Sequence, residues 1–197
     1  IFPHHENEIA QSEGAGKSFA RLWIHNGLLT INQEKMAKSL GNFISIRDFI
    51  KDYKDADYLK LLFLSTHYRH PVDYTEEKIG EMKAQKERFR IFFDKVNRIA
   101  KASGLVASAS LETIRAAKSD DEFRKRFEDA MDDDFNTPLA LASLFDMVTS
   151  ANKSMQGKED YTRYEIEDLL AIKKLIAFLS GVLGLNLEKD LTRQDVD

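Results

Sequence analysis

Helix-forming patterns run through this 197-residue sequence from about residue 45 onward. Apolar residues recur there at alternating spacings of three and four, which gives each helical segment one apolar face. Long helices with one apolar face become stable by burying it against one another. Residues 76–184 are therefore predicted to form an antiparallel helical bundle.

Three apolar stripes carry this prediction. They consist of Phe89, Phe92, Phe93, Val96 and Ile99; of Leu141, Leu144, Phe145, Val148 and Met155; and of Leu169, Ile172, Ile176, Leu179 and Leu183. Side chains typical of helix starts separate them and predict N-caps at Ser45, Asp55, Thr75, Ser119, Thr137 and Thr162. The small and polar residues 103–110 predict a loop between helices.

The first 50 residues have a mixed pattern. Residues 4–12 are predicted to be helical after Pro3, and residues 12–17 form a flexible loop. Residues 28–31 are a short strand candidate, followed by a turn at 32–34. Beyond this turn, the sequence predicts helices without further strands.

The predicted helix at 4–12 carries a candidate metal site. His4 and Glu8 lie four residues apart and therefore share one helix face. A neutral imidazole and a carboxylate are both zinc ligands. His5 and Glu8, three residues apart, are a competing pair, and from spacing alone a polar helix face at a domain surface is the favoured interpretation.

A second candidate site follows the predicted turn, where the sequence reads KMAKSLGNF over residues 35–43. Lys35 and Lys38 lie three residues apart in a short loop next to serine and glycine. Two ammonium groups in such a loop can stabilise the negative charge that develops on a polyphosphate during activation of a substrate by ATP. The alternative is an ordinary lysine-rich surface hairpin.

Three segments, IFPHHENEIAQS, RLWIHNG and KMAKSLGNF, closely resemble segments of the cysteinyl-tRNA synthetases, which are class I aminoacyl-tRNA synthetases. AMDDDFNTP, at 130–138, also resembles the anticodon-binding helical region of that family. The resemblance implies that His4 and Glu8 bind zinc together with two upstream cysteines that this chain lacks. It also implies catalytic roles for Lys35 and Lys38, with Lys38 binding ATP. Ala37 replaces a serine of the family, and its effect stays open, as do the roles of His5 and His25.

The resemblance implies a mostly α fold: the end of a class I α/β nucleotide-binding catalytic domain followed by an antiparallel helical bundle of the anticodon-binding type. The expected divisions are residues 1–50 for the catalytic end, 51–75 for a helical connector, 76–184 for the tRNA-binding bundle and 185–197 for a linker to a further module. The chain would then be the later part of a larger enzyme and inactive alone.

The implied reaction activates cysteine with ATP and magnesium and transfers it to tRNA(Cys). Direct binding of the substrate sulfur to zinc would reject serine, because a hydroxyl is a poor zinc ligand. Two alternatives remain. One is a related ligase that joins cysteine to an amino sugar through the same adenylate, and the other is a non-catalytic helical RNA-binding module.

The net charge of −4 excludes a globally basic nucleic-acid binder, so tRNA contact must come from a local patch. The segment 76–101 is a candidate, because its eight basic residues outnumber five acidic ones. The eight basic residues are Lys78, Lys83, Lys86, Arg88, Arg90, Lys95, Arg98 and Lys101. A solvated helix face with mixed ion pairs explains them equally well. The absence of cysteine excludes disulfides and is compatible with a reducing cytosol, and no apolar run is long enough to span a membrane. A cytoplasmic location and a monomeric state are expected.

Overall fold

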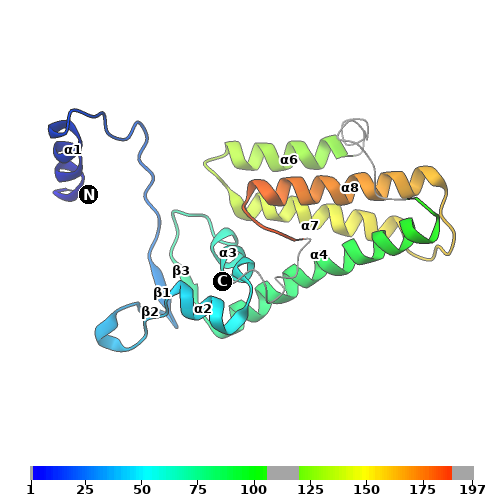
Figure 1. The fold of residues 1–197 in the computed structure, drawn as a ribbon, viewed down its shortest axis with the longest axis horizontal. Helices are drawn as coiled ribbons and strands as arrows, with labels where there is room; N and C mark the ends of the chain where they lie inside the picture. The colour runs from blue at the N-terminus through cyan, green and yellow to red at the C-terminus, as the bar shows by residue number, and fades with distance from the viewer. Residues whose placement is uncertain (1, 106–119, 188–197) are drawn as a thin grey trace.

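The computed structural model describes residues 2–105 and 120–187, and it is mostly helical. Figure 1 shows a helix at one end, a small sheet below it, and a group of long helices at the other end. The predicted N-cap at Ser119, the greater part of the loop at 103–110, and residues 188–197 of the predicted linker lie outside the described residues. Within those residues, no helix is both long enough and apolar enough to cross a membrane.

The N-terminal part begins with α1 (His4–Gly14), which confirms the predicted helix and extends it by one half-turn. No regular structure follows until β1 (Leu29–Ile31), which pairs antiparallel with β2 (Glu34–Lys35). A 3₁₀ turn, η1 (Lys38–Leu40), then leads to α2 (Ile46–Tyr53) and α3 (Ala56–Leu64). The predicted strand and turn are thus a β-hairpin.

The structure adds a strand that the sequence pattern did not predict. β3 (Val72–Tyr74) pairs in parallel with β1, so the sheet has the order β2-β1-β3. The prediction that residues 51–75 are purely helical is wrong for these three residues. Val72 and Tyr74 are buried on one face of the strand, but three residues are too short to show an alternating pattern.

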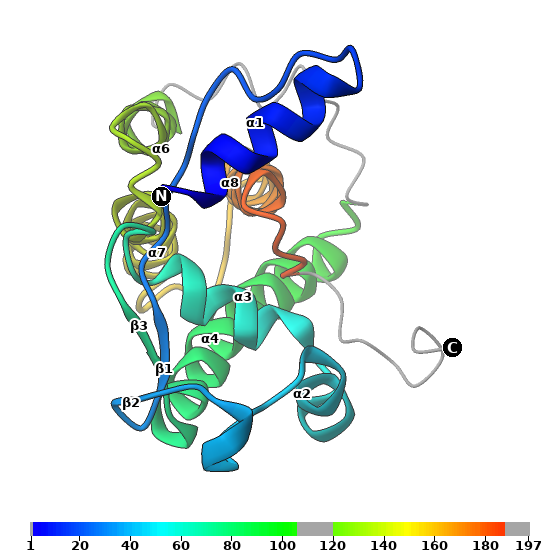
Figure 2. The same ribbon diagram turned by 90° about the vertical axis from the view of Figure 1, so that its left-hand side faces the viewer.

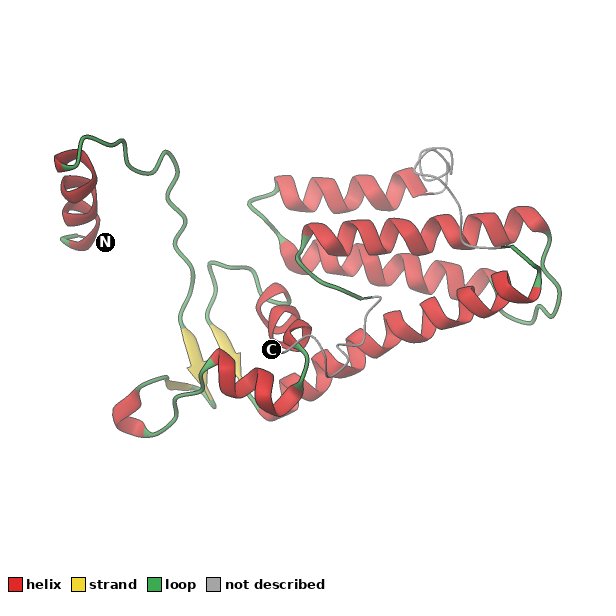
Figure 3. Cartoon of the chain, in the orientation of Figure 1, coloured by secondary structure: helices red, strands yellow, loops and turns green. Residues whose placement is uncertain are grey.

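Four long helices form the predicted bundle: α4 (Glu76–Ala102), α6 (Asp120–Asp132), α7 (Thr137–Ser154) and α8 (Arg163–Val182). In the view of Figures 1 and 3 the chain runs back and forth through them, so neighbouring helices are antiparallel. The three predicted stripes form the core, where Phe92, Leu144 and Ile176 are completely buried. Burying such side chains supplies most of the free energy that holds the helices together.

The predicted helix starts are confirmed at Ser45, Asp55, Thr75 and Thr162, whose side chains accept hydrogen bonds from N–H groups of the first turn. The prediction for α7 was wrong by one residue. Its N-cap is Asn136, whose Oδ1 accepts from the N–H of Leu139 at 3.2 Å. An amide oxygen caps as well as a hydroxyl, so Thr137 already belongs to the helix.

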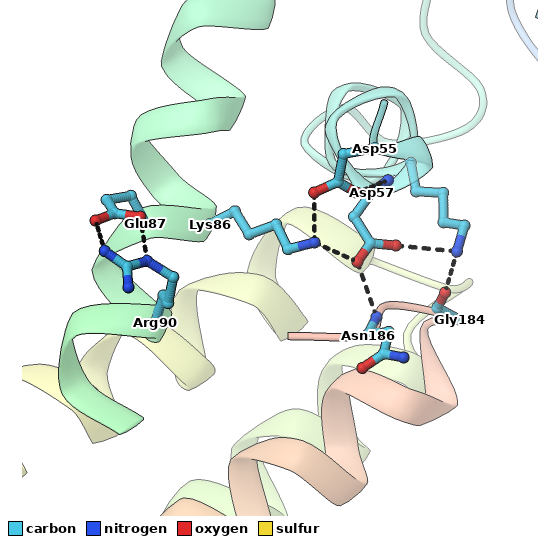
Figure 4. Close-up of polar contacts among 8 residues, drawn as sticks. Asp55, Asp57, Lys86, Glu87, Arg90, Gly184 and Asn186 are labelled. Atoms are coloured by element: carbon cyan, nitrogen blue, oxygen red, sulfur yellow. Dashed lines mark hydrogen bonds and ion pairs between the residues drawn. The ribbon is translucent and has the colours of Figure 1, made fainter. Parts of the chain in front are cut away.

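A buried ion cluster attaches α3 to the bundle (Figure 4). Lys86 of α4 donates to Asp55 Oδ2 at 2.6 Å and to Asp57 Oδ2 at 3.0 Å. Asp57 also accepts from the backbone N–H of Asn186, beyond α8, at 3.0 Å. Desolvation alone would lower the pKa of Lys86, but hydrogen bonds and charge from both carboxylates outweigh it and raise the pKa. The carboxylate of Asp57 thus connects α3 with α4 through Lys86 and with the segment beyond α8 through Asn186.

Candidate functional site

α1 carries the two predicted metal ligands on one face, since His4 and Glu8 are one helical turn apart. Both side chains are exposed, and neither makes a hydrogen bond or ion pair within the described residues. In the part of the chain that the structure describes, no group of three or more His, Cys, Asp or Glu side chains is arranged so that it could hold a metal ion. α1 therefore offers two donors of types that zinc accepts, and the remaining ligands of a tetrahedral site would have to come from elsewhere.

His5 is packed against the segment that contains Trp23 and His25. Its ring stacks on Trp23 with centroids 4.2 Å apart and on His25 with centroids 4.9 Å apart. The Nε2 atoms of His5 and His25 are 3.4 Å apart. Desolvation is the largest cause that lowers the pKa of His5, and the neighbouring His25 acts in the same direction. The structure thus joins the HHENE and WIHNG segments through His5, a contact that the sequence did not reveal.

The hairpin between β1 and β2 presents the lysine loop. Asn32 and Gln33 have φ angles of 52° and 66°, as a tight two-residue turn requires. Asp73 of β3 holds this turn, because its Oδ1 accepts from Thr30 Oγ1 at 2.6 Å and from the N–H of Gln33 at 2.8 Å. These two hydrogen bonds lower the pKa of Asp73, so the hairpin is held by a charged acceptor.

Asn42 closes the lysine loop. Its Oδ1 accepts from the N–H of Ala37 at 2.9 Å, and its Nδ2 donates to the carbonyl of Lys35 at 3.2 Å. Lys35 is exposed at the end of β2, and Lys38 begins η1. The closing contact uses the backbone of residue 37, so it does not need the serine hydroxyl that Ala37 lacks. Asn42 was not predicted as a site residue, although its position after Gly41, with a φ of 67°, is typical of a turn.

The two candidate sites lie far apart along the molecule. Figures 1 and 2 show α1 at one end of an extended segment and the β1–β2 hairpin at the other. The structure places His4 and Glu8 one turn apart on α1 and the backbones of Lys35 and Lys38 in one loop, but it does not bring the two segments together.

The basic residues of α4 are less available for RNA than the sequence suggested. Lys86 is buried in the ion cluster, so the prediction that it belongs to an RNA-facing patch is wrong. Arg90 pairs with Glu87 at 2.6 Å, as Figure 4 shows, and with Asp94 at 2.9 Å. The guanidinium of Arg88 lies over the ring of Phe145, 4.9 Å from its centre. For the middle of the helix, these contacts favour a face with mixed ion pairs over a free basic patch.

Two family models match separate parts of the chain. Residues 1–84 match the model described as tRNA synthetases class I (C) catalytic domain, and residues 126–188 match the DALR domain. The first match includes α1, the small sheet and both lysines of the loop. The second covers α7, α8 and the second half of α6.

Several curated relatives match along the chain. A protein of Thermodesulfovibrio yellowstonii named cysteine--tRNA ligase is 42% identical over 198 residues, covering 100% of this chain and 39% of the relative. Proteins of the same name from Bacillus velezensis and Geobacter sp. strain M21 are 41% and 42% identical, covering 100% and 94% of this chain and 41% and 37% of their own lengths. The chain spans about two fifths of the length of the curated relatives it matches.

Proposed function

The chain belongs to the cysteinyl-tRNA synthetase family, and we propose that it is the later part of an enzyme that activates cysteine with ATP and transfers it to tRNA(Cys). The observation that carries the proposal is the match to relatives of this name over the whole chain, through both candidate sites and the bundle. The names of these relatives favour tRNA over an amino sugar as the acceptor. Intact lysines in an ordered loop favour an enzyme over a non-catalytic binding module.

We propose the following division of labour along the chain. Residues 1–50 complete the catalytic domain, and residues 51–75, with β3 included, connect it to the bundle. The bundle at 76–184 binds the tRNA, and residues 185–197 lead to a further module. We also propose that the enzyme is a cytoplasmic monomer.

His4 and Glu8 are proposed to hold zinc together with two thiolates from outside this chain. Their side chains fit this role because both are exposed, unpaired within the described residues and one helical turn apart. When bound, zinc would supply a Lewis acid that binds the sulfur of cysteine in preference to the oxygen of serine. His5 would orient this end of α1 through its stacking with Trp23 and His25.

Lys35 and Lys38 are proposed to act on ATP, which enters with magnesium as a substrate. Adenylation places negative charge on the α-phosphate and on the departing pyrophosphate, and ammonium groups stabilise that charge most strongly in the transition state. Lys38 is proposed to contact ATP directly. Asn42 and Asp73 contribute by holding the loop and the hairpin in one conformation, which reduces the rearrangement needed during the reaction.

Cysteine-dependent ATP–pyrophosphate exchange by the full-length protein, with and without tRNA(Cys), tests this proposal. We expect exchange with cysteine but not with serine, together with cysteinyl-tRNA formation and bound zinc. A His4→Ala variant should lose zinc and bind cysteine more weakly. Exchange followed by transfer to an amino sugar instead of tRNA would replace the proposal by the alternative ligase. No exchange at all would refute it.

A further inference from the structure

The connection between α3 and β3, which includes residues 67–70, belongs to the part of the chain that matches the catalytic domain. Figures 1 and 2 both show it beside the turn that joins α6 to α7. On its other side it contacts the segment that precedes β1. The carbonyl of Tyr68 accepts from the N–H of Gly27 at 2.7 Å, and a Cβ atom on Gly27 would lie 2.2 Å from the carbonyl oxygen of His70. This connection therefore touches the backbone directly after the WIHN residues.

Asp134, in the α6–α7 turn, reaches across to this connection. Its Oδ1 accepts from the hydroxyl of Tyr68 at 2.7 Å, and its Oδ2 accepts from Nε of Arg69 at 2.6 Å. The imidazole of His67 lies 3.9 Å from the same Oδ2. These hydrogen bonds lower the pKa of Asp134, so the carboxylate stays charged. A single carboxylate of the bundle thus contacts three side chains of the connection: it accepts hydrogen bonds from Tyr68 and Arg69, and it lies close to His67.

The α6–α7 turn has an unfavourable backbone conformation at the point where Asp134 makes these contacts. Asp134 and Phe135 have φ angles of 53° and 55°, two consecutive residues in the left-handed region without a glycine. Asp tolerates this region better than most residues, but a bulky aromatic residue does not. Such a conformation persists only where surrounding contacts demand it, and it occurs preferentially where geometry matters for function.

We propose that Asp134 is a positioning residue that sets the orientation of the helical bundle relative to the segment carrying the active-site residues, so that tRNA bound to the bundle presents its end correctly. This inference rests on the proposed function. The alternative role for Arg69, a direct contact with an RNA phosphate, is less favourable, because its charge is already paired with Asp134. Since that pair is exposed, it contributes little to overall stability, and its removal should leave the fold intact.

The test uses the full-length protein and two assays. Asp134→Asn removes the charge but keeps the shape and a residue that tolerates the left-handed conformation. We expect cysteinyl-tRNA formation (kcat/KM for tRNA) to fall by about ten- to a hundredfold, because small misplacements of a substrate cost that much. Pyrophosphate exchange without tRNA should stay within about twofold of wild type, because the cysteine and ATP sites are untouched.

Asp133→Asn is the matched control. Asp133 is the adjacent exposed carboxylate, and its side chain makes no hydrogen bond or ion pair within the described residues. It should leave both activities unchanged. Arg69→Gln should reproduce part of the effect of Asp134→Asn, and the double variant should be no worse than Asp134→Asn alone, because Asp134→Asn already removes the ion pair with Arg69.

The outcomes separate this inference from the proposed function. If wild-type protein does not charge tRNA, the proposed function is wrong. If wild type charges tRNA and Asp134→Asn charges it equally well, the inference is wrong. It is also overturned if exchange and charging fall together, since that would make Asp134 a general support of the fold, or if the effects of the two single variants are additive.

Discussion

The N-terminal segment and the helical bundle use their side chains in opposite ways. Residues 2–48 bury a single side chain, that of Ile31, whereas α4, α7 and α8 bury eight, seven and eight side chains respectively. The bundle therefore has a hydrophobic core formed by its own residues. The segment that carries the proposed chemistry has no such core, so its stability must come from contacts with other parts of the protein.

The exposed apolar side chains of the N-terminal segment support the same conclusion, that its stability depends on contacts outside itself. Leu22, Ile24 and Leu28 are 85%, 59% and 66% exposed on the segment between α1 and β1. An apolar surface of this kind normally marks a contact with other protein. In a family whose curated members are more than twice as long as this chain, we interpret this segment as one that packs against the rest of the catalytic domain.

The largest expected effect comes from isolating the chain. Residues 1–197 alone should show no cysteine-dependent pyrophosphate exchange and should not retain zinc, because two ligands do not close a tetrahedral site. Exchange and zinc content, measured against the full-length protein, check this. Activity in the isolated chain would contradict the contrast between the two regions, because the N-terminal segment would then form a working site without contacts outside the chain.

The next effect concerns stability. Phe92→Ala, at a fully buried position of α4, should lower the free energy of unfolding by about 3–5 kcal/mol through lost burial and a new cavity. Ile91→Ala, next to it and 54% exposed, should change it by less than about 0.5 kcal/mol. Denaturant unfolding of the 1–197 chain gives both values. Equal effects at the two positions would contradict the core described for the bundle.

Lys38→Ala in the full-length protein should affect activity strongly and stability little, which is the reverse of what Phe92→Ala should do. We expect adenylation to slow by on the order of a hundredfold, or roughly 3 kcal/mol, with little change in cysteine affinity or unfolding. Lys35→Ala should have a similar or milder effect, and Lys51→Ala on α2 serves as the control. Pre-steady-state adenylate formation measures the difference. An unchanged adenylation rate with slower transfer to tRNA would move the role of Lys38 to the RNA step.

The smallest effect is a pH dependence at the surface of the bundle. Glu165 accepts hydrogen bonds from Lys158 and from the backbone and hydroxyl of Thr162, which lower its pKa from 4.5 to about 2. A lowered folded-state pKa stabilises the fold above the unfolded pKa, and this contribution disappears as the pH falls from about 4.5 to about 2. Glu165→Gln should therefore flatten the acid side of the stability profile. An identical profile in both proteins would show that this contact is not formed in solution.

The parts of the structure that were predicted from sequence depend on local signals. The N-caps at Thr75 and Thr162 act on the N–H groups of the first helical turn, and the stripe of Phe89, Phe92 and Phe93 repeats with the helical period. Both signals lie within a few residues and can be read without knowing the fold. The proposed metal ligands on α1 and the proposed catalytic lysines likewise lie in contiguous segments of sequence, and their roles stay predictions.

The features that were missed depend on partners far away in the sequence. Asp73 holds a turn 40 residues away, and Asp134 contacts Arg69 65 residues away. Lys86 carried a signal that was not used. It lies four residues after Met82 and three before Phe89, on the buried face of α4, where a charge must be paired. Extending the apolar stripe backwards would have placed Lys86 in the core.

Amide hydrogen exchange tests the contrast between the two regions most directly, because it reports the opening free energy of each segment. We predict that α4, α7 and α8 of the isolated 1–197 chain exchange slowly, at rates limited by unfolding of the bundle, while α1 exchanges almost freely. In the full-length protein, α1 and residues 17–28 should become protected. Equal protection of α1 and the bundle in the isolated chain, or an unprotected α1 in the full-length protein, would contradict this account.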